Sequence, residues 1–277
     1  MAYRSKEEWA DLLIIPLYRE MYLQTLWNAA KEKNRLEGWT LKNDSWAPWF
    51  YNMRPIGDSA KLFHDVCRAM ADLILVHSLD VLIGIEMAGV PLIGGTAVAS
   101  LAYNDRSRRI GYTRPLPEKV RTPQECMDLL RKISTDSAQQ YGQKEFVEAR
   151  LRNGDIVGIF DDMANDLGSK LIARLIVLWA AQQSRISVTC NKVFYTLNRS
   201  ANNRKKASDF AFNPELGLVP AELEVNYIIE FDEKLPKLQK VMRPDEYRVI
   251  CDFQNNPGHF QDPDVQKEIL ALAAKAA

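Results

Sequence analysis

The sequence predicts an α/β protein with a doubly wound, mostly parallel sheet flanked by helices, and with a small hood formed by the N-terminal segment. Two observations predict this fold. The apolar runs at 80–85 and 156–160 are continuous rather than alternating, as in strands that are buried on both faces. Each run is followed by a loop and a helical stretch, and strands that alternate with helices favour a parallel sheet. The 277 residues suffice for one such core with an appended subdomain.

The N-terminal segment, 1–57, is predicted to begin as a helix and to continue as the hood. Residues 6–36 carry helical patterning, with strong helix propensity over 18–36, and Gly38 ends the helix. Residues 39–54 then predict two short strands joined by a polar turn. This stretch holds three of the six tryptophans. A core accounts for one or two of them, whereas three around one loop indicate a flat ligand or a subunit interface.

The core, 58–210, is predicted to open with an amphipathic helix at 58–76, followed by the buried strand at 80–85. A helix rich in small residues then runs through 94–100, and its glycines and alanines allow close packing on a sheet. Residues 109–113 are expected to form a further strand. This first half therefore supplies two strands and the helices that cover them.

The second half of the core begins with a polar, helix-prone stretch, 115–140, which predicts an inserted helix or a mobile excursion. After the second buried strand, a helix is expected at 169–183, and one or two strands are expected within 186–197. The C-terminal segment, 211–277, alternates short apolar pieces with turns and ends in a helix at 263–276. We expect this segment to be a strand/helix extension that packs on the core.

Net charge and cysteine content limit the classes of function that this chain can have. Lys+Arg and Asp+Glu both number 36, so the formal net charge is zero and gives no global attraction to nucleic acid or to anionic membranes. No apolar run approaches the roughly 18 residues of a membrane helix, and the N-terminus lacks the apolar region of a signal peptide. The four cysteines show no CxxC spacing, which indicates free thiols in a reducing compartment. We therefore expect a cytoplasmic protein without nucleic-acid or membrane partners.

Two adjacent carboxylates, Asp161 and Asp162, follow the second buried strand and precede a tight turn and a helix. Ligands of open α/β sheets bind outside the carboxyl ends of the strands, and helix N-termini there offer N–H groups to anions. Two carboxylates suit the vicinal hydroxyls of a ribose or a hydrated Mg²⁺. The stretch therefore predicts a sugar-phosphate site, and the alternative is an ordinary strand–turn–helix connection with a solvated acidic turn.

Three segments with a shared order extend this prediction. Residues 41–54 form a lysine-containing loop, residues 84–92 read Gly-Ile-Glu-Met-Ala-Gly-Val-Pro-Leu, and residues 141–149 lead towards the acidic pair. In order and spacing they resemble the type I phosphoribosyltransferases, and within these the orotate phosphoribosyltransferases. They are similar to the loop that closes over base and sugar, the pyrophosphate loop, and the end of the mobile catalytic loop. The resemblance spans roughly residues 39–199.

The resemblance implies a glycosyltransferase (pentosyltransferase) of pyrimidine biosynthesis that transfers phosphoribose from phosphoribosyl pyrophosphate to a base, orotate. It implies a homodimer and Mg²⁺ that enters with the substrate, with Asp161 and Asp162 as candidate protein ligands. Asp161 and Asp162 would hold the ribose hydroxyls, and Lys144 would join them as a catalytic residue. The implied substrate contacts are Lys42 and Phe50 from the hood, Glu86, Met87, Ala88 and Gly89 at the pyrophosphate, Asn165, Asp166, Leu167, Gly168 and Ser169 at the 5′-phosphate, and Arg199, whose fork suits the orotate carboxylate.

Two departures from the family pattern keep a second hypothesis open. Residues 165–167, Asn-Asp-Leu, stand where the family has Thr-Thr-Gly. Like charges about 4 Å apart at an effective dielectric constant near 20 repel by roughly 4 kcal/mol, so Asp166 would oppose a bound phosphate. The residues before Tyr141-Gly142 also lack the family's lysines. The alternative is a catalytically impaired regulatory protein that binds a nucleotide or base on the same fold.

Overall fold

The computed structural model describes residues 3–33, 37–41, 44–103, 107–120, 122–135, 146–165, 167–199 and 223–276. The chain divides into two compact units. The first unit comprises Met1–Trp9 and Phe63–Glu230, and the second comprises Ala10–Leu62 and Phe231–Ala277. Most of the segment predicted as the hood thus shares a unit with the end of the chain, a grouping that the sequence did not predict.

The first unit is built on a six-stranded sheet with the strand order β10-β9-β8-β5-β6-β7. The first five of these strands are parallel to one another, and the short β7 is antiparallel to β6. This arrangement confirms the predicted, mostly parallel sheet. The strands are β5 (Val81–Ile85), β6 (Arg109–Thr113), β7 (Val147–Glu148), β8 (Ile156–Ala164), β9 (Thr189–Asn198) and β10 (Glu224–Glu230).

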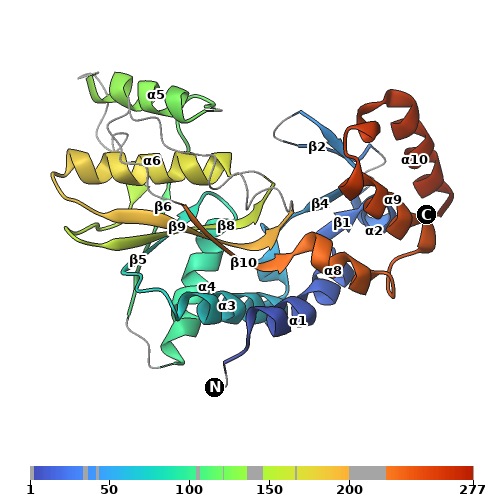
Figure 1. The fold of residues 1–277 in the computed structure, drawn as a ribbon, viewed down its shortest axis with the longest axis horizontal. Helices are drawn as coiled ribbons and strands as arrows, with labels where there is room; N and C mark the ends of the chain where they lie inside the picture. Colours follow the sequence, from blue (N-terminus) through green and yellow to red (C-terminus); the bar gives the residue numbers. More distant parts are fainter. Residues whose placement is uncertain are drawn as a thin grey trace. The chain divides into compact units, whose positions relative to one another are not determined.

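Helices cover both faces of this sheet (Figure 1). Helices α3 (Ala60–Ile74) and α4 (Gly89–Leu101) lie against one face, α6 (Gly168–Gln183) lies against the other, and α5 (Pro123–Thr135) packs on α6. The helices expected at 58–76 and 169–183 are confirmed, and the predicted insertion contains α5. The doubly wound arrangement therefore follows from the apolar periodicity of the sequence.

Strand β8 is longer than the sequence predicted, and this changes the acidic pair. The prediction ended the strand at residue 160, but β8 pairs with β9 as far as Ala164 opposite Asn198. Asp161 and Asp162 therefore lie within the strand and not in the turn after it. The two carboxyl groups lie close to each other at the end of the strand, where the side chain of Asp161 interacts with that of Asp162.

The second unit contains the remaining elements. Its N-terminal part holds α1 (Lys6–Arg19, which begins in the first unit), β1 (Leu23–Thr25), α2 (Leu26–Lys33), β2 (Trp39–Thr40), β3 (Trp46–Ala47), β4 (Trp49–Tyr51) and the 3₁₀ turn η1 (Ile56–Asp58). Its C-terminal part holds α8 (Phe231–Leu238), α9 (Pro244–Asn255), η3 (His259–Gln261) and α10 (Pro263–Ala276), which confirms the predicted last helix.

The helix predicted over 18–36 is interrupted in the structure. Met21 adopts a left-handed φ of 58°, and β1 follows it and pairs antiparallel with β4, with Leu23 opposite Tyr51. Helix propensity is worth at most about 0.7 kcal/mol per ordinary residue, so the buried β1–β4 pairing outweighs it here.

The three tryptophans of the predicted hood loop belong to the core of the second unit. Trp39, Trp46 and Trp49 are all buried, and Trp49 has no exposed surface. Trp39 stacks on Phe50 with ring centroids 6.3 Å apart, and Trp49 stacks on Phe231 at 4.1 Å. The suggestion that the tryptophans mark a flat ligand or an interface is therefore unnecessary, since packing accounts for all three.

Candidate functional site

The carboxyl ends of β5, β8 and β9 bring three predicted site segments together. Gly84 of β5 lies opposite Phe160 of β8, and Ala164 of β8 lies opposite Asn198 of β9. The Arg199 N–H donates to the Ala164 carbonyl at 2.9 Å, which ties the end of β9 to the end of β8. Loop 86–88, the acidic pair and the residue after β9 therefore meet at one edge of the sheet, where open α/β sheets bind ligands.

The loop between β5 and α4 lies against β8 because two glycines allow it. A Cβ on Gly89 would be 2.5 Å from the carbonyl oxygen of Phe160 and 3.1 Å from the Cα of Gly84, and a Cβ on Gly84 would be 2.7 Å from the carbonyl oxygen of Gly89. Of the predicted pyrophosphate contacts, Glu86 and Met87 are exposed, whereas Ala88 and Gly89 are buried. The Glu86–Met87 peptide bond is cis.

Gly89→Ala is expected to destabilise the first unit by about 1–3 kcal/mol, since its methyl group would collide with backbone atoms that cannot move separately. Urea denaturation followed by circular dichroism measures the change. Gly94→Ala is the matched control, because it lies on the same helix and an added Cβ there meets nothing within 4 Å. Ala is favoured over Gly inside helices by up to about 1 kcal/mol, so the control is expected to be neutral or stabilising. Equal effects of the two substitutions would contradict the packing argument.

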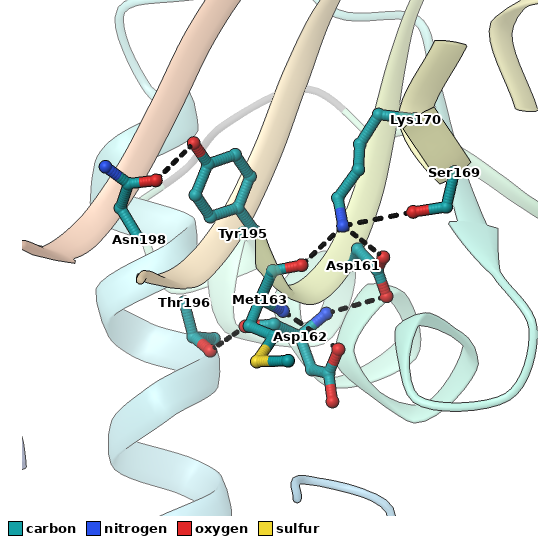
Figure 2. A network of polar contacts seen from close by, with 8 residues as sticks. All are labelled: Asp161, Asp162, Met163, Ser169, Lys170, Tyr195, Thr196 and Asn198. Atoms are coloured by element: carbon teal, nitrogen blue, oxygen red, sulfur yellow. Dashed lines mark hydrogen bonds and ion pairs between the residues drawn. The ribbon is translucent and has the colours of Figure 1, made fainter. Parts of the chain in front are cut away.

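Asp161 forms a buried ion pair with Lys170, the third residue of α6 (Figure 2). The Lys170 Nζ lies 2.7 Å from Asp161 Oδ2 and 3.2 Å from Ser169 Oγ, and it also donates to the Met163 carbonyl. The lysine side chain is 4% exposed and the aspartate side chain 11%. An ammonium has three donors, and the three oxygens account for all of them.

The Asp162 carboxyl group lies beside that of Asp161, and Figure 2 shows it directed away from Lys170. The Asp162 N–H donates to Asp161 Oδ1 at 2.9 Å, and the Met163 N–H donates to Asp162 Oδ1 at 2.8 Å. The Thr196 hydroxyl donates to the Asp162 carbonyl. Burial, together with the neighbouring charge of Asp161, raises the pKa of Asp162 from 3.8 to about 7. Burial disfavours the charged form of a carboxyl, so the proton is held more tightly in the folded state.

This raised pKa predicts a pH-dependent stability. A carboxyl whose pKa is higher in the folded state stabilises the fold fully below the unfolded pKa, near 4, and the stabilisation is lost as the pH rises through about 7. Asp162→Asn is expected to remove this loss and to be more stable than the wild type at pH 8, by on the order of 2 kcal/mol. Urea denaturation at pH 4.5 and pH 8 measures the difference. Asp128→Asn, at an exposed position on α5, is the control and should leave the pH dependence unchanged. Parallel pH profiles for Asp162→Asn and the wild type would refute the assignment.

The predicted phosphate loop has one residue that belongs to the core. Leu167 is fully buried and packs with the α6 residues that face the sheet. Its φ of −94° is ordinary for a leucine, so no glycine is required at this position. Asn165, Gly168 and Ser169 are half-buried, and Asp166 lies outside the described residues. Gly168 and Ser169 begin α6, where helices commonly bind anions.

The remaining predicted residues are distributed as follows. Arg199 is buried in the first unit, and burial lowers its pKa to about 9. Phe50 lies on β4 of the second unit. Lys42 and Lys144 lie outside the described residues. The sheet edge therefore brings together the acidic pair, the 86–89 loop, the start of α6 and Arg199.

Sequence reasoning missed Lys170 and the polar chain beside it. The Tyr195 hydroxyl lies 3.2 Å from Asn198 Oδ1, and the Asn198 amide donates to both carboxylate oxygens of Glu230 at 2.9 and 3.1 Å. Lys170 was detectable in principle. It follows Leu167 by three residues and precedes Leu171, so it falls on the apolar face of α6, where a charged side chain indicates a buried partner.

The acidic pair does not fit a directly bound Mg²⁺. Asp161 Oδ2 is engaged by Lys170, Asp161 Oδ1 accepts the Asp162 N–H, and Asp162 Oδ1 accepts the Met163 N–H. Mg²⁺ requires near-octahedral oxygen ligands. Within the described ranges, no group of three or more His, Cys, Asp or Glu side chains is arranged to hold a metal ion. We therefore assign no chemical step to a metal ion on these carboxylates.

No protein-family model matches the chain, and no curated protein matches it in sequence. Solved structures do match its fold. The UMP synthase of Leishmania donovani is 14% identical with a TM-score of 0.58, and the match covers 91% of this chain and 43% of that one. This chain thus spans less than half of that enzyme. The orotate phosphoribosyltransferase of Francisella tularensis is 13% identical with a TM-score of 0.54, covering 88% of this chain and 98% of that one.

The orotate phosphoribosyltransferase of Aeropyrum pernix gives a similar result, with 13% identity, a TM-score of 0.52, and coverage of 83% of this chain and 99% of that one. These likenesses confirm the fold that the sequence resemblance implied. Identities this low leave the chemistry of the site to be argued from its residues.

Proposed function

We propose that this chain, which shares the fold of the orotate phosphoribosyltransferases, transfers phosphoribose from phosphoribosyl pyrophosphate to a pyrimidine base. Orotate is the base that we propose, and the products are a nucleoside monophosphate and pyrophosphate. The observation that carries the proposal is the meeting of the glycine-packed 86–89 loop with the acidic end of β8 at one sheet edge.

The reaction explains why such a site needs both kinds of segment. As pyrophosphate leaves, the sugar C1 becomes positively charged, so the protein must hold an anion on each side of a developing cation. In this proposal the 86–89 loop holds the pyrophosphate, Asp162 and Asp161 face the ribose, and the start of α6 holds the 5′-phosphate. Arg199 binds the orotate carboxylate, and Lys144 is the further catalytic residue of the proposal. Mg²⁺ enters with phosphoribosyl pyrophosphate and not on the acidic pair.

Pyrophosphorolysis of orotidine monophosphate and its reverse reaction test the proposal. The purified chain should release orotate when given pyrophosphate and Mg²⁺, and Asp162→Asn should lower kcat/KM on the order of a hundredfold. Asp128→Asn, on the exposed face of α5, should leave the rate unchanged. No turnover in either direction, together with no binding of phosphoribosyl pyrophosphate by calorimetry, overturns the proposal.

A second candidate is a regulatory protein that binds a nucleotide or base on this fold without turnover. The specific observation in its favour is the Asp161–Lys170 pair, which occupies one of the two carboxylates proposed for the ribose. Such a protein would bind nucleoside monophosphates and show a thermal shift without any pyrophosphate-dependent reaction. A measurable turnover that Asp162→Asn abolishes would eliminate this candidate.

We further propose a cytoplasmic homodimer. Four partly exposed apolar side chains of the first unit, Val98 and Leu101 on α4 and Ile110 and Tyr112 on β6, are available to a second copy. Light scattering that gives a monomeric mass would contradict the dimer.

In the described parts of the chain, no helix has the length and apolarity that crossing a membrane requires. All four cysteines are free thiols.

A further inference from the structure

We propose that Lys170 is a resident cation of the acidic corner. Its ammonium holds Asp161 in the place that a divalent metal ion would otherwise take, so that the corner binds its ligand without a metal ion on the protein. This inference deepens the proposed function, on which it rests only for the choice of the sugar-phosphate probe.

The surroundings of the ammonium resemble those of a bound cation. A carboxylate oxygen of Asp161, the Met163 carbonyl oxygen and the Ser169 hydroxyl oxygen surround Lys170 Nζ. Carboxylate, carbonyl and hydroxyl oxygens are also the ligands that hard divalent cations take. The oxygen atoms that a metal ion would need as ligands therefore already contact the ammonium of Lys170.

Burial makes this arrangement difficult to displace. Both side chains are nearly inaccessible, and separating a buried ion pair leaves an uncompensated charge, which the low-dielectric interior disfavours strongly. A Mg²⁺ ion would also have to shed part of its tightly held water shell to reach Asp161. Exchange of the lysine for the metal ion is therefore unfavourable on both sides.

The position of Lys170 connects its charge to ligand binding. Its contacts join Met163, near the end of β8, to Ser169, at the start of α6, so the ammonium links the strand to the helix. The Asp161–Lys170 pair has no net charge. The corner should therefore accept the hydroxyls and phosphate of a sugar phosphate with little repulsion from Asp161.

Manganese titration tests the inference directly. Mn²⁺ alone, followed by the electron paramagnetic resonance signal of the free ion, should bind the wild type no better than Asp161→Asn. Lys170→Met should gain one Mn²⁺ site, and the double variant Asp161→Asn/Lys170→Met should lose it again. A wild-type Mn²⁺ site that disappears in Asp161→Asn overturns the inference, as does a folded Lys170→Met without the gain.

Two additions keep the test decisive. If circular dichroism shows that Lys170→Met does not fold, Lys170→Gln replaces it, because the amide retains a donor for the Met163 carbonyl. Calorimetry with ribose 5-phosphate should give wild-type affinities within about twofold in EDTA and in Mg²⁺, and a tenfold requirement for Mg²⁺ would also overturn the inference. None of these readouts involves turnover. If the chain is inactive but binds ribose 5-phosphate without a metal ion, the proposed function fails and the inference stands. If the chain is active but the wild type has a Mn²⁺ site on Asp161, the inference fails and the proposed function stands.

Discussion

Lys170→Met is expected to destabilise the first unit by about 3–5 kcal/mol, which is among the largest effects of any single substitution in this chain. The substitution removes the cation from a carboxylate that is 11% exposed, and an uncompensated buried charge carries a cost of this size. Urea denaturation followed by far-ultraviolet circular dichroism measures the loss at pH 8.

The double variant Asp161→Asn/Lys170→Met separates the ion pair from the shape of the side chains. It removes both charges, so it should recover most of the stability that either single variant loses, and the coupling energy should exceed about 2 kcal/mol. Lys132→Met is the matched control. Lys132 pairs with Glu118 at 3.2 Å, but these side chains are 72% and 63% exposed, and exposed pairs contribute about 0–1 kcal/mol. Additive single effects of Asp161 and Lys170 would show that the pair is not the source of the stability.

Trp49→Ala is expected to destabilise the second unit by about 3–5 kcal/mol, because it deletes a fully buried indole. The ring stacks on Phe231 with centroids 4.1 Å apart, and it joins the N-terminal and C-terminal parts of the unit. Four of the six tryptophans lie in this unit, so tryptophan fluorescence during urea denaturation reports mainly on its unfolding.

The control for Trp49→Ala is Leu12→Ala, which lies in the same unit at a 43% exposed position of α1. Exposed substitutions usually change the stability by less than about 0.5 kcal/mol. A fluorescence transition that shifts equally in both variants would indicate that residues 10–62 and 231–277 do not form one cooperative unit.

Much of the fold follows from local patterns. The continuous apolar runs of β5 and β8, the amphipathic α3 and the helix at 263–276 are all confirmed, because each depends on residues within a dozen positions of one another. The short β1 was missed for the opposite reason, since its partner β4 lies more than 20 residues further along the chain. A strand was expected in the C-terminal segment, but the position of β10 was not predicted, because the short apolar pieces there do not reveal that one of them pairs with β9.

The sequence likewise predicted only part of the candidate site. The sequence located the acidic pair and the 86–89 loop, and the sheet edge brings them together. It did not reveal that Asp161 is paired with Lys170, because the apolar position of Lys170 in α6 indicates a buried partner without identifying it. It also suggested an aromatic ligand loop where the structure has buried tryptophans, since composition alone does not distinguish a core from a binding surface.

The sequence by itself determined the alternation of strands and helices in the parallel core and the sheet edge that we propose for a ligand, because hydrophobic periodicity and parallel topology fix both. The tertiary structure alone decided where β8 ends, because that depends on its pairing with β9 as far as Asn198. This pairing places Asp161 and Asp162 side by side within the strand, and Asp161 forms an ion pair with Lys170 of α6. The charge of the acidic corner is therefore set by a contact between a strand and a helix, which no local pattern of residues encodes.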